Sequence, residues 1–268
     1  MNVIRINPVW TWPLVVALLA MPSVVVAEMV LANLILTSPT VNTNTLEQSL
    51  SIQVGTRTEV DTETPTLHGN IMANLDIDFS SISTPTVISI ETDGGRIEID
   101  DENFFLDLGI AGTLTVTLTD VSGTANTPNG SSLVTSGNFN AAEHALVFDA
   151  GVLTTTGTNL IAIDESIDQS LEPNTVVSSS TGRVDLSLVS VTGNLATYDV
   201  TLVLPIDSET SESRNVSNFN VTQMVTVVGE LRASGQITKV IPEPATAVLL
   251  LGAGAVILLS RRRRVVPI

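Results

Sequence analysis

Apolar and polar residues alternate with a period of two along the middle of the chain, and no stretch there keeps the 3.6-residue period of an amphipathic helix. The clearest example is 113–119, where Thr fills every odd position and an aliphatic residue every even one. The same alternation predicts strands at 49–54, 71–79, 86–91, 96–100, 113–119, 145–149, 183–191, 195–204 and 224–228. Because such strands have one polar and one apolar face, we expect an all-β fold: an antiparallel β-sandwich-like domain, with a barrel-like closure as the alternative.

Turn residues separate several of these strands. Gly94-Gly95 and Gly193-Asn194 each lie between two predicted strands, and both pairs predict a two-residue hairpin turn. Polar stretches at 122–132 and 207–218 predict long exposed loops. Residues 229–235 are expected to continue the last strand through a bulge. We expect a single Ser/Thr-rich domain over 28–240, with a split near 164–182 as the alternative.

The first 27 residues have the order of a secretory signal peptide. Arg5 is the only charged residue among them, an apolar stretch follows at 14–21, and Pro22 precedes a small residue at Ala27. Eight apolar residues rise only about 12 Å as a helix, which is too short to span a bilayer of about 30 Å. We therefore predict that 1–27 is a signal peptide cleaved after Ala27, with Ala32 as the alternative site. An uncleaved anchor that continues through 29–32 is the alternative interpretation.

The last 28 residues, 241–268, have three parts in a fixed order. Pro242-Glu243-Pro244 comes first, a mainly apolar run at 245–259 predicts one transmembrane helix, and four consecutive Arg residues follow at 261–264. Fifteen residues give about 22 Å of helix, which is short for a span, but flanking Arg side chains can reach the interface. Since Arg clusters stay on the cytoplasmic side, the body is expected to lie outside the cytoplasm, as the signal peptide also predicts.

This C-terminal arrangement resembles the PEP-CTERM sorting signal of bacterial exported proteins, over 28 of the 268 residues. The resemblance implies an exosortase-like membrane enzyme as a partner and a bacterium that makes extracellular polysaccharide. It also implies a membrane-anchored precursor that is later placed at the cell surface or in the extracellular matrix. An ordinary membrane anchor is the alternative. The residues to which the resemblance assigns a role are Pro242, Glu243 and Pro244 for recognition, and Arg261, Arg262, Arg263 and Arg264 for the topological stop.

Composition excludes several kinds of site and partner for the body, residues 28–240. The chain has no Cys, which removes disulfides and thiolate metal sites. Of the 28 acidic and 11 basic residues, 27 and six lie in 28–240, so the body has a net charge of −21. Nucleic-acid binding needs Lys and Arg to neutralise phosphates, so we expect no nucleic-acid partner.

The best metal candidate is calcium, which prefers carboxylate and carbonyl oxygens. Asp93, Asp100, Asp101 and Glu102 lie on either side of the predicted Gly94-Gly95 turn, so they could converge on one ion. Their spacing does not match an EF-hand loop, and a solvated acidic rim that keeps the protein soluble is the favoured interpretation. No other cofactor is expected.

Evidence for an enzyme is weak. The two His residues, His68 and His144, are expected at solvated loop edges, and no G-x-S-x-G motif is present. Sugar-binding clefts use aromatic side chains, whereas the body has no Trp and one Tyr. We therefore predict a non-enzymatic, exported surface or matrix protein. The alternative is a carbohydrate-active or other secreted hydrolase, and a minor alternative is a sugar-binding or ice-binding module, the latter suggested by the Thr row of 113–119.

Overall fold

The computed structural model describes residues 27–40, 43–157, 167–170, 174–216 and 219–241, and these residues are almost entirely β-strand. Within the described ranges, two short 3-10 helices lie between strands, η2 (Gly109–Ala111) and η3 (Ala141–Glu143). The strands are β1 (Glu28–Leu36), β2 (Leu46–Val54), β3 (Arg57–Glu63), β4 (Leu67–Asp78), β5 (Thr86–Ile99), β6 (Glu102–Asp107), β7 (Thr113–Asn126), β8 (Ser132–Leu133), β9 (Asn138–Asn140), β10 (Ala145–Gly157), β11 (Ile167–Ser170), β12 (Asn174–Val177), β13 (Thr181–Thr192), β14 (Leu195–Val216) and β15 (Phe219–Val240).

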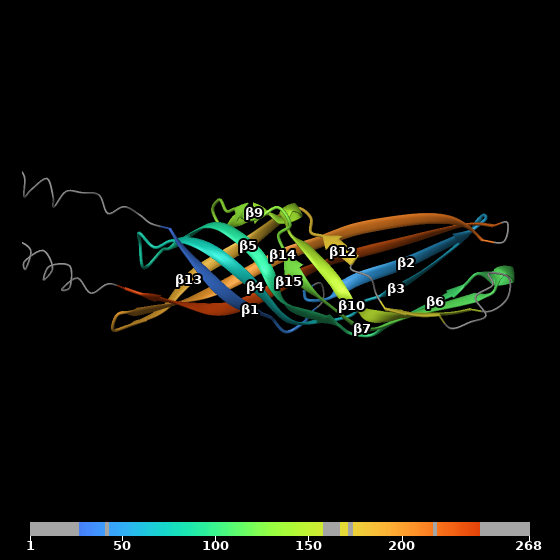
Figure 1. The fold of residues 1–268 in the computed structure, drawn as a ribbon, viewed down its shortest axis with the longest axis horizontal. Coiled ribbons are helices and arrows are strands. Elements are labelled where there is room, and N and C mark those ends of the chain that lie inside the picture. The colour runs from blue at the N-terminus through green and yellow to red at the C-terminus, as the bar shows by residue number, and fades with distance from the viewer. Residues whose placement is uncertain (1–26, 41–42, 158–166, 171–173, 217–218, 242–268) are drawn as a thin grey trace, which may run out of the picture.

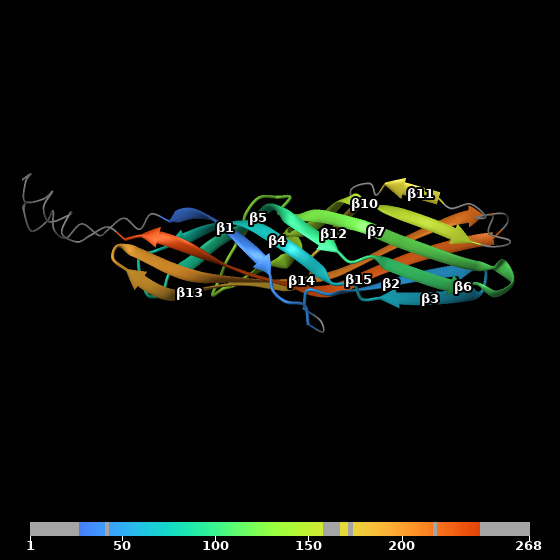
Figure 2. The ribbon, with the colours of Figure 1, turned by 90° about the horizontal axis from the view of Figure 1, so that it is seen from below.

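All of these strands belong to one antiparallel sheet of 15 strands, so the predicted all-β antiparallel fold is confirmed. Its main path runs β11-β10-β7-β5-β4-β1-β15-β14-β13-β9, and β2, β3, β6, β8 and β12 pair alongside it. Strand β1 is the link between the two halves, because it pairs with β4 on one side and with β15 on the other. Figure 2 shows the half with β4, β5 and β7 lying against the half with β13, β14 and β15.

The core lies between these two halves and consists of two clusters. The larger cluster is built from inward-facing residues such as Leu34, Leu75 and Tyr198, all of which are fully buried. The smaller cluster joins β2 to β6 and β7 and contains Ile52 and Phe104. Burial of alternate aliphatic side chains is the driving force that holds the halves together.

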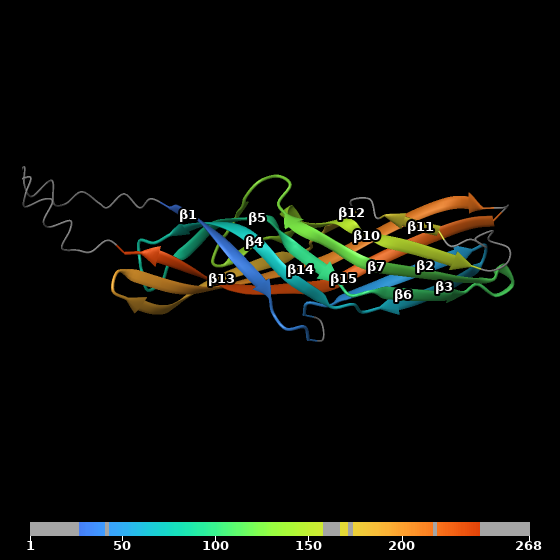
Figure 3. The same cartoon turned by 60° about the horizontal axis from the view of Figure 1, so that its bottom comes forward.

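The longest element is the hairpin of β14 and β15. Each strand has 22 residues, and they pair in unbroken register from Leu195↔Val240 to Val216↔Phe219. At about 3.4 Å per residue, the hairpin extends over roughly 75 Å. The molecule is accordingly elongated, with β1 beginning and β15 ending at one end of the long axis, as Figures 1 and 3 show.

Two local predictions are confirmed. Thr192 pairs with Leu195 across Gly193-Asn194, so this dipeptide is the turn of a hairpin between β13 and β14. In β7, Leu114 and Val116 are buried while the Thr residues of 113–119 are only partly so, which is the alternation that the sequence predicted.

The predicted hairpin turn at Gly94-Gly95 is wrong, because β5 runs through it as a single strand. Both glycines have positive φ, 106° and 92°, and the pairing of β5 with β7 shifts register between Gly94 and Ile97. A Cβ on Gly95 would lie 2.3 Å from the carbonyl oxygen of Asn70 in β4. The glycines therefore form an irregularity at which β4 approaches β5 closely, instead of reversing the chain.

The two predicted polar loops are also wrong in large part. Strand β7 continues to Asn126, and Ser122 and Ala125 within it are buried. Residues 207–216 belong to β14 and pair with the beginning of β15. A paired strand can have this polar composition, since backbone pairing does not depend on apolar side chains. Residues 229–235 continue β15 as predicted but pair with β14 without a register shift, so the predicted bulge is wrong.

No helix of the described residues is long and apolar enough to cross a membrane. The predicted transmembrane helix 245–259 and nearly all of the predicted signal peptide lie outside the described residues.

Candidate functional site

The four calcium candidates occupy three different places. Asp93 lies within β5 opposite Asn126, Asp100 and Asp101 form the exposed connection between β5 and β6, and Glu102 begins β6 with its side chain buried. Among the described residues, no group of three or more His, Asp or Glu side chains is arranged to hold a metal ion. The predicted convergence across Gly94-Gly95 fails because no turn exists there.

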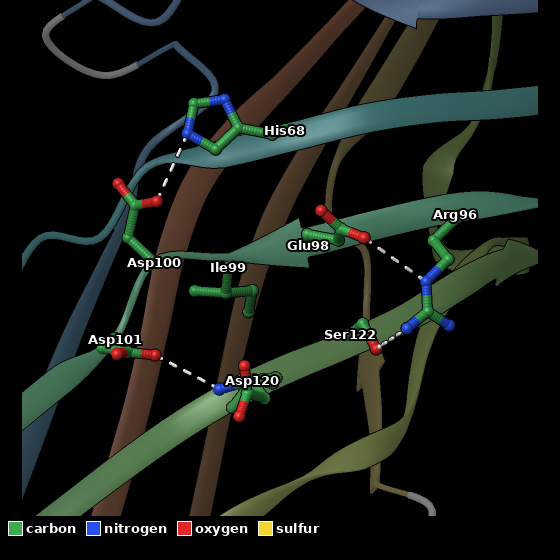
Figure 4. Close-up of a pocket in the computed structure, with 9 residues that line it drawn as sticks. His68, Arg96, Glu98, Ile99, Asp100, Asp101, Asp120 and Ser122 are labelled. Carbon is green, nitrogen blue, oxygen red and sulfur yellow. Dashed lines mark hydrogen bonds and ion pairs between the residues drawn. The ribbon is translucent and has the colours of Figure 1, made fainter.

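Asp100 and Asp101 instead border an open depression of about 510 Å³, which we call the polar groove (Figure 4). Strands β4, β5 and β7 supply its walls, and most of its lining is charged. The groove is lined by His68, Arg96, Glu98, Ile99, Asp100, Asp101, Asp120, Val121 and Ser122.

Two ion pairs lie within the polar groove, and the carboxylate of Asp101 accepts the backbone N–H of Asp120. His68 Nε2 lies 3.3 Å from Asp100 Oδ1, and Arg96 Nε lies 3.5 Å from Glu98 Oε1. Arg96 Nη2 also donates to Ser122 Oγ at 2.6 Å. The His68, Asp100, Arg96 and Glu98 side chains are all more than half exposed, so each ion pair contributes little to stability.

The polar groove contains a His, carboxylates and a Ser, but they are not arranged as a nucleophile and its base. Figure 4 shows His68 beside Asp100 at one end and Ser122 beside Arg96 at the other. Ser122 accepts its hydrogen bond from a guanidinium, whereas an activated Ser must donate to a base. Of the described contacts, none is a hydrogen bond between His68 and Ser122.

Glu102 is the most unusual carboxyl group of the described residues. The residue is 3% exposed, Gln48 Nε2 donates to its Oε1 at 2.8 Å, and its Oε2 is buried without a hydrogen-bond partner in the described structure. Burial, and secondarily the negative charge of Glu63, raises the pKa of Glu102 from its ordinary 4.5 to about 8. Glu102 is therefore mainly protonated at neutral pH, so it can donate a hydrogen bond.

Glu102 lines a cavity of about 230 Å³, which we call the Glu102 cavity. Gln48 is its other polar wall residue, and the remaining nine lining residues are apolar. They are Leu46, Ile99, Leu118, Val121, Phe148, Leu153, Val176, Val225 and Val227. Seven strands contribute to its walls, namely β2, β5, β6, β7, β10, β12 and β15.

Sequence reasoning placed Glu102 on an exposed acidic loop. Its true position shows in the alternation of β6, where Glu102, Phe104 and Leu106 are buried and Asn103, Phe105 and Asp107 are exposed. The adjacent pair Phe104-Phe105 obscured this period in the sequence, because Phe105 is an aromatic residue on the outer face.

His144 is not at a solvated loop edge, as predicted, but fully buried. Its Nδ1 lies 3.0 Å from Thr92 Oγ1 and 3.1 Å from Thr127 Oγ1, and its ring meets Phe139 edge-on. Burial lowers the pKa of His144 to about 4, so it is neutral at pH 7. Its partners are 52 and 17 residues away in sequence, which explains why no local signal predicted the contact.

His68, by contrast, is exposed as predicted, on the surface of β4. The predicted cleavage residue Ala27 directly precedes β1, and the last described residue, Ile241, donates its backbone N–H to the carbonyl of Asn194 at 2.7 Å. The residues predicted for sorting all lie outside the described residues: Pro242, Glu243, Pro244, Arg261, Arg262, Arg263 and Arg264.

Comparison with known proteins identifies the tail. Residues 240–264 match the PEP-CTERM protein-sorting motif. No curated protein and no solved structure matches the chain. The motif implies an exported protein whose membrane-anchored precursor is sorted to the cell surface and processed by an exosortase, a membrane enzyme. The chain therefore carries the sorting signal of PEP-CTERM proteins, beginning where β15 ends.

Proposed function

We propose that the protein is a non-enzymatic component of the cell surface or extracellular matrix. Its acidic β-body is exported, held at the membrane by its C-terminal tail, and then processed by an exosortase and placed in a polysaccharide layer. The polysaccharide and the absence of catalysis are parts of this proposal.

The observation that carries the proposal is the position of the two ends of the body. The carboxylate of Glu28, next to the predicted cleavage residue, forms an ion pair with the ammonium group of Lys239, next to the sorting motif. Strand β1 also pairs directly with β15. Both ends of the body therefore lie at one end of the long axis, as Figure 1 shows.

This arrangement gives the anchored precursor a defined orientation. The turns of the hairpins β2–β3 and β6–β7, and the paired ends of β14 and β15 at Val216 and Phe219, lie at the opposite end of the molecule (Figure 1). A body tethered at one end and about 75 Å long holds its far hairpins well away from the membrane surface. That is the geometry expected of a surface protein that reaches into a hydrated layer. The body's net charge of −21 favours solubility and disfavours self-association there.

The competing function is a secreted hydrolase that uses the same sorting route. The polar groove would be its site, since it holds His68, Asp100 and Ser122. The observed contacts disfavour that role, because Ser122 is bonded to Arg96 and not to a base.

The experiment compares wild-type protein with two variants in the producing bacterium, by immunoblotting of membrane and matrix fractions. A sorting variant carries P242A, E243Q and P244A, and a groove variant carries H68A and S122A. We expect the wild type and the groove variant in the matrix, with the same matrix mass and texture, and the sorting variant in the membrane. A matrix defect produced by the groove variant, at a normal protein level, would support the hydrolase instead.

A further inference from the structure

The Glu102 cavity lies where the two core clusters meet. Leu118 and Val225 pack against both clusters and also line the cavity. Close-packed interiors have few voids larger than a water molecule, so an opening of about 230 Å³ at this junction is a departure from ordinary packing. An apolar cavity of about 150 Å³ is enough to bind benzene. The Glu102 cavity therefore has room for a somewhat larger molecule.

One polar atom points to the chemistry of an occupant. Glu102 Oε1 already accepts a hydrogen bond from Gln48, whereas Oε2 is buried and has no partner among the described residues. Buried polar atoms of native proteins nearly always have a hydrogen-bond partner, so an unpartnered carboxyl oxygen beside a cavity calls for one inside it.

The charge of the occupant follows from the surroundings of Glu102. Its carboxyl group is protonated at neutral pH because burial and Glu63 raise its pKa to about 8. Glu63, on β3, is the charged residue that acts on it, and Gln48 on β2 is neutral. An anion would be repelled by Glu63, and a cation would require a buried ion pair whose desolvation is costly. A neutral acceptor satisfies the O–H group without any change of charge.

We propose that the Glu102 cavity is a binding site for a small, uncharged, mainly apolar molecule that carries one hydrogen-bond acceptor, such as a ketone, ester or ether. The apolar walls enclose the body of the molecule, and the Glu102 carboxyl group donates to its acceptor oxygen. This site does not involve the sorting signal, and it shares only Ile99 and Val121 with the wall of the polar groove, so its test does not depend on the proposed surface role.

The probes are three molecules of nearly the same shape: acetophenone, isopropylbenzene and 1-phenylethylammonium. Binding to the full chain is measured at pH 6.5 by saturable shifts of the thermal unfolding midpoint, Tm, at several probe concentrations. We expect acetophenone to bind about fivefold more tightly than isopropylbenzene, the advantage given by one hydrogen bond. We expect the ammonium compound to bind most weakly.

Variants distinguish the contribution of the hydrogen bond to probe binding from that of the cavity. E102Q retains a donor and should keep the preference for acetophenone, whereas E102L should bind the two neutral probes equally. V225F fills the cavity and should bind neither, and L153F serves the same purpose if V225F does not fold. E98Q removes an exposed acid of the polar groove and should behave as wild type.

Three results would overturn the proposal. The first is no saturable Tm shift with any probe, which would mean that the cavity holds only water or closes. The second is unchanged binding in the cavity-filling variants, which would place the probes elsewhere. The third is tightest binding of the ammonium compound, which would make Glu102 an anion that binds cations.

Discussion

Replacement of Glu102 by Gln should change how the stability of the fold depends on pH. The folded protein holds the Glu102 proton up to a pKa of about 8, whereas the unfolded chain releases it near 4.5. Between these values the folded state binds more protons than the unfolded state, so stability falls as pH rises. Below pH 4.5 this contribution is constant, and above pH 8 the loss is complete.

The magnitude can be worked out for a pH window in which His144 contributes little. His144 has the opposite sign, because its pKa is lowered from 6.5 to about 4 and stability falls as pH drops through that range. Between pH 6.5 and 8 Glu102 gives the larger change, and His144 offsets about 0.4 kcal/mol of it because the unfolded imidazole is half protonated at pH 6.5. At about 1.4 kcal/mol per pH unit, and with Glu102 half deprotonated by pH 8, the wild type should lose about 1 kcal/mol of unfolding free energy across this window.

Urea unfolding at closely spaced pH values is the assay, because ΔG and m are obtained together. Gln has the shape of a protonated Glu and still accepts from Gln48, so E102Q should fold and should lack the loss above pH 6.5. E98Q, which changes an exposed acid, should retain it. The reasoning is refuted if E102Q and wild type lose stability in parallel, since Glu102 would then titrate normally in the folded state.

Three further predictions follow from other sites. The wild type should lose about 3 kcal/mol of unfolding free energy between pH 6.5 and 4 through His144, and H144L should lack this loss in the same urea titration. The same dependence of stability on pH in H144L and wild type would mean that His144 is solvated. G95A should lower the unfolding free energy by about 1–3 kcal/mol more than G94A, because the added Cβ meets the Asn70 carbonyl at Gly95 but nothing within 4 Å at Gly94. Both glycines have positive φ, so G94A is the control for backbone strain, and equal losses would contradict the close approach of β4 and β5. Because no three acidic side chains of the described residues converge on one ion, Ca²⁺ should raise Tm no more than sodium chloride at matched ionic strength; a calcium-specific rise that D100N with D101N abolishes would contradict this.

The sequence was sufficient to predict the all-β fold because burial on one face leaves a period of two in each strand. Residues 113–119 show it most clearly, and the Gly193-Asn194 turn lies between two such strands. Strands made mainly of polar residues show no such period of two in the sequence. Residues 207–216 are held by backbone pairing with β15, which constrains their side chains little, so they resemble a loop in sequence.

The candidate sites were harder to predict because each depends on contacts between distant residues. Glu102 is buried by strands from six parts of the chain, and His144 finds its partners in Thr92 and Thr127. Because a carboxyl group and an imidazole are strongly polar, a sequence-based analysis places both at the surface. At Gly94-Gly95, a turn and an irregular strand need the same positive φ, so the residue types alone cannot separate them.

Intact-mass measurement of the protein purified from the cell surface of the producing bacterium tests the central claim, that the body is sorted and processed through its C-terminal signal. The account predicts a mature chain that begins at Glu28 and has lost the apolar helix and the Arg cluster, with its new C-terminus in or near Pro242-Glu243-Pro244. The P242A, E243Q, P244A variant should keep the whole tail. A surface protein whose mass still includes Ile268 would contradict processing.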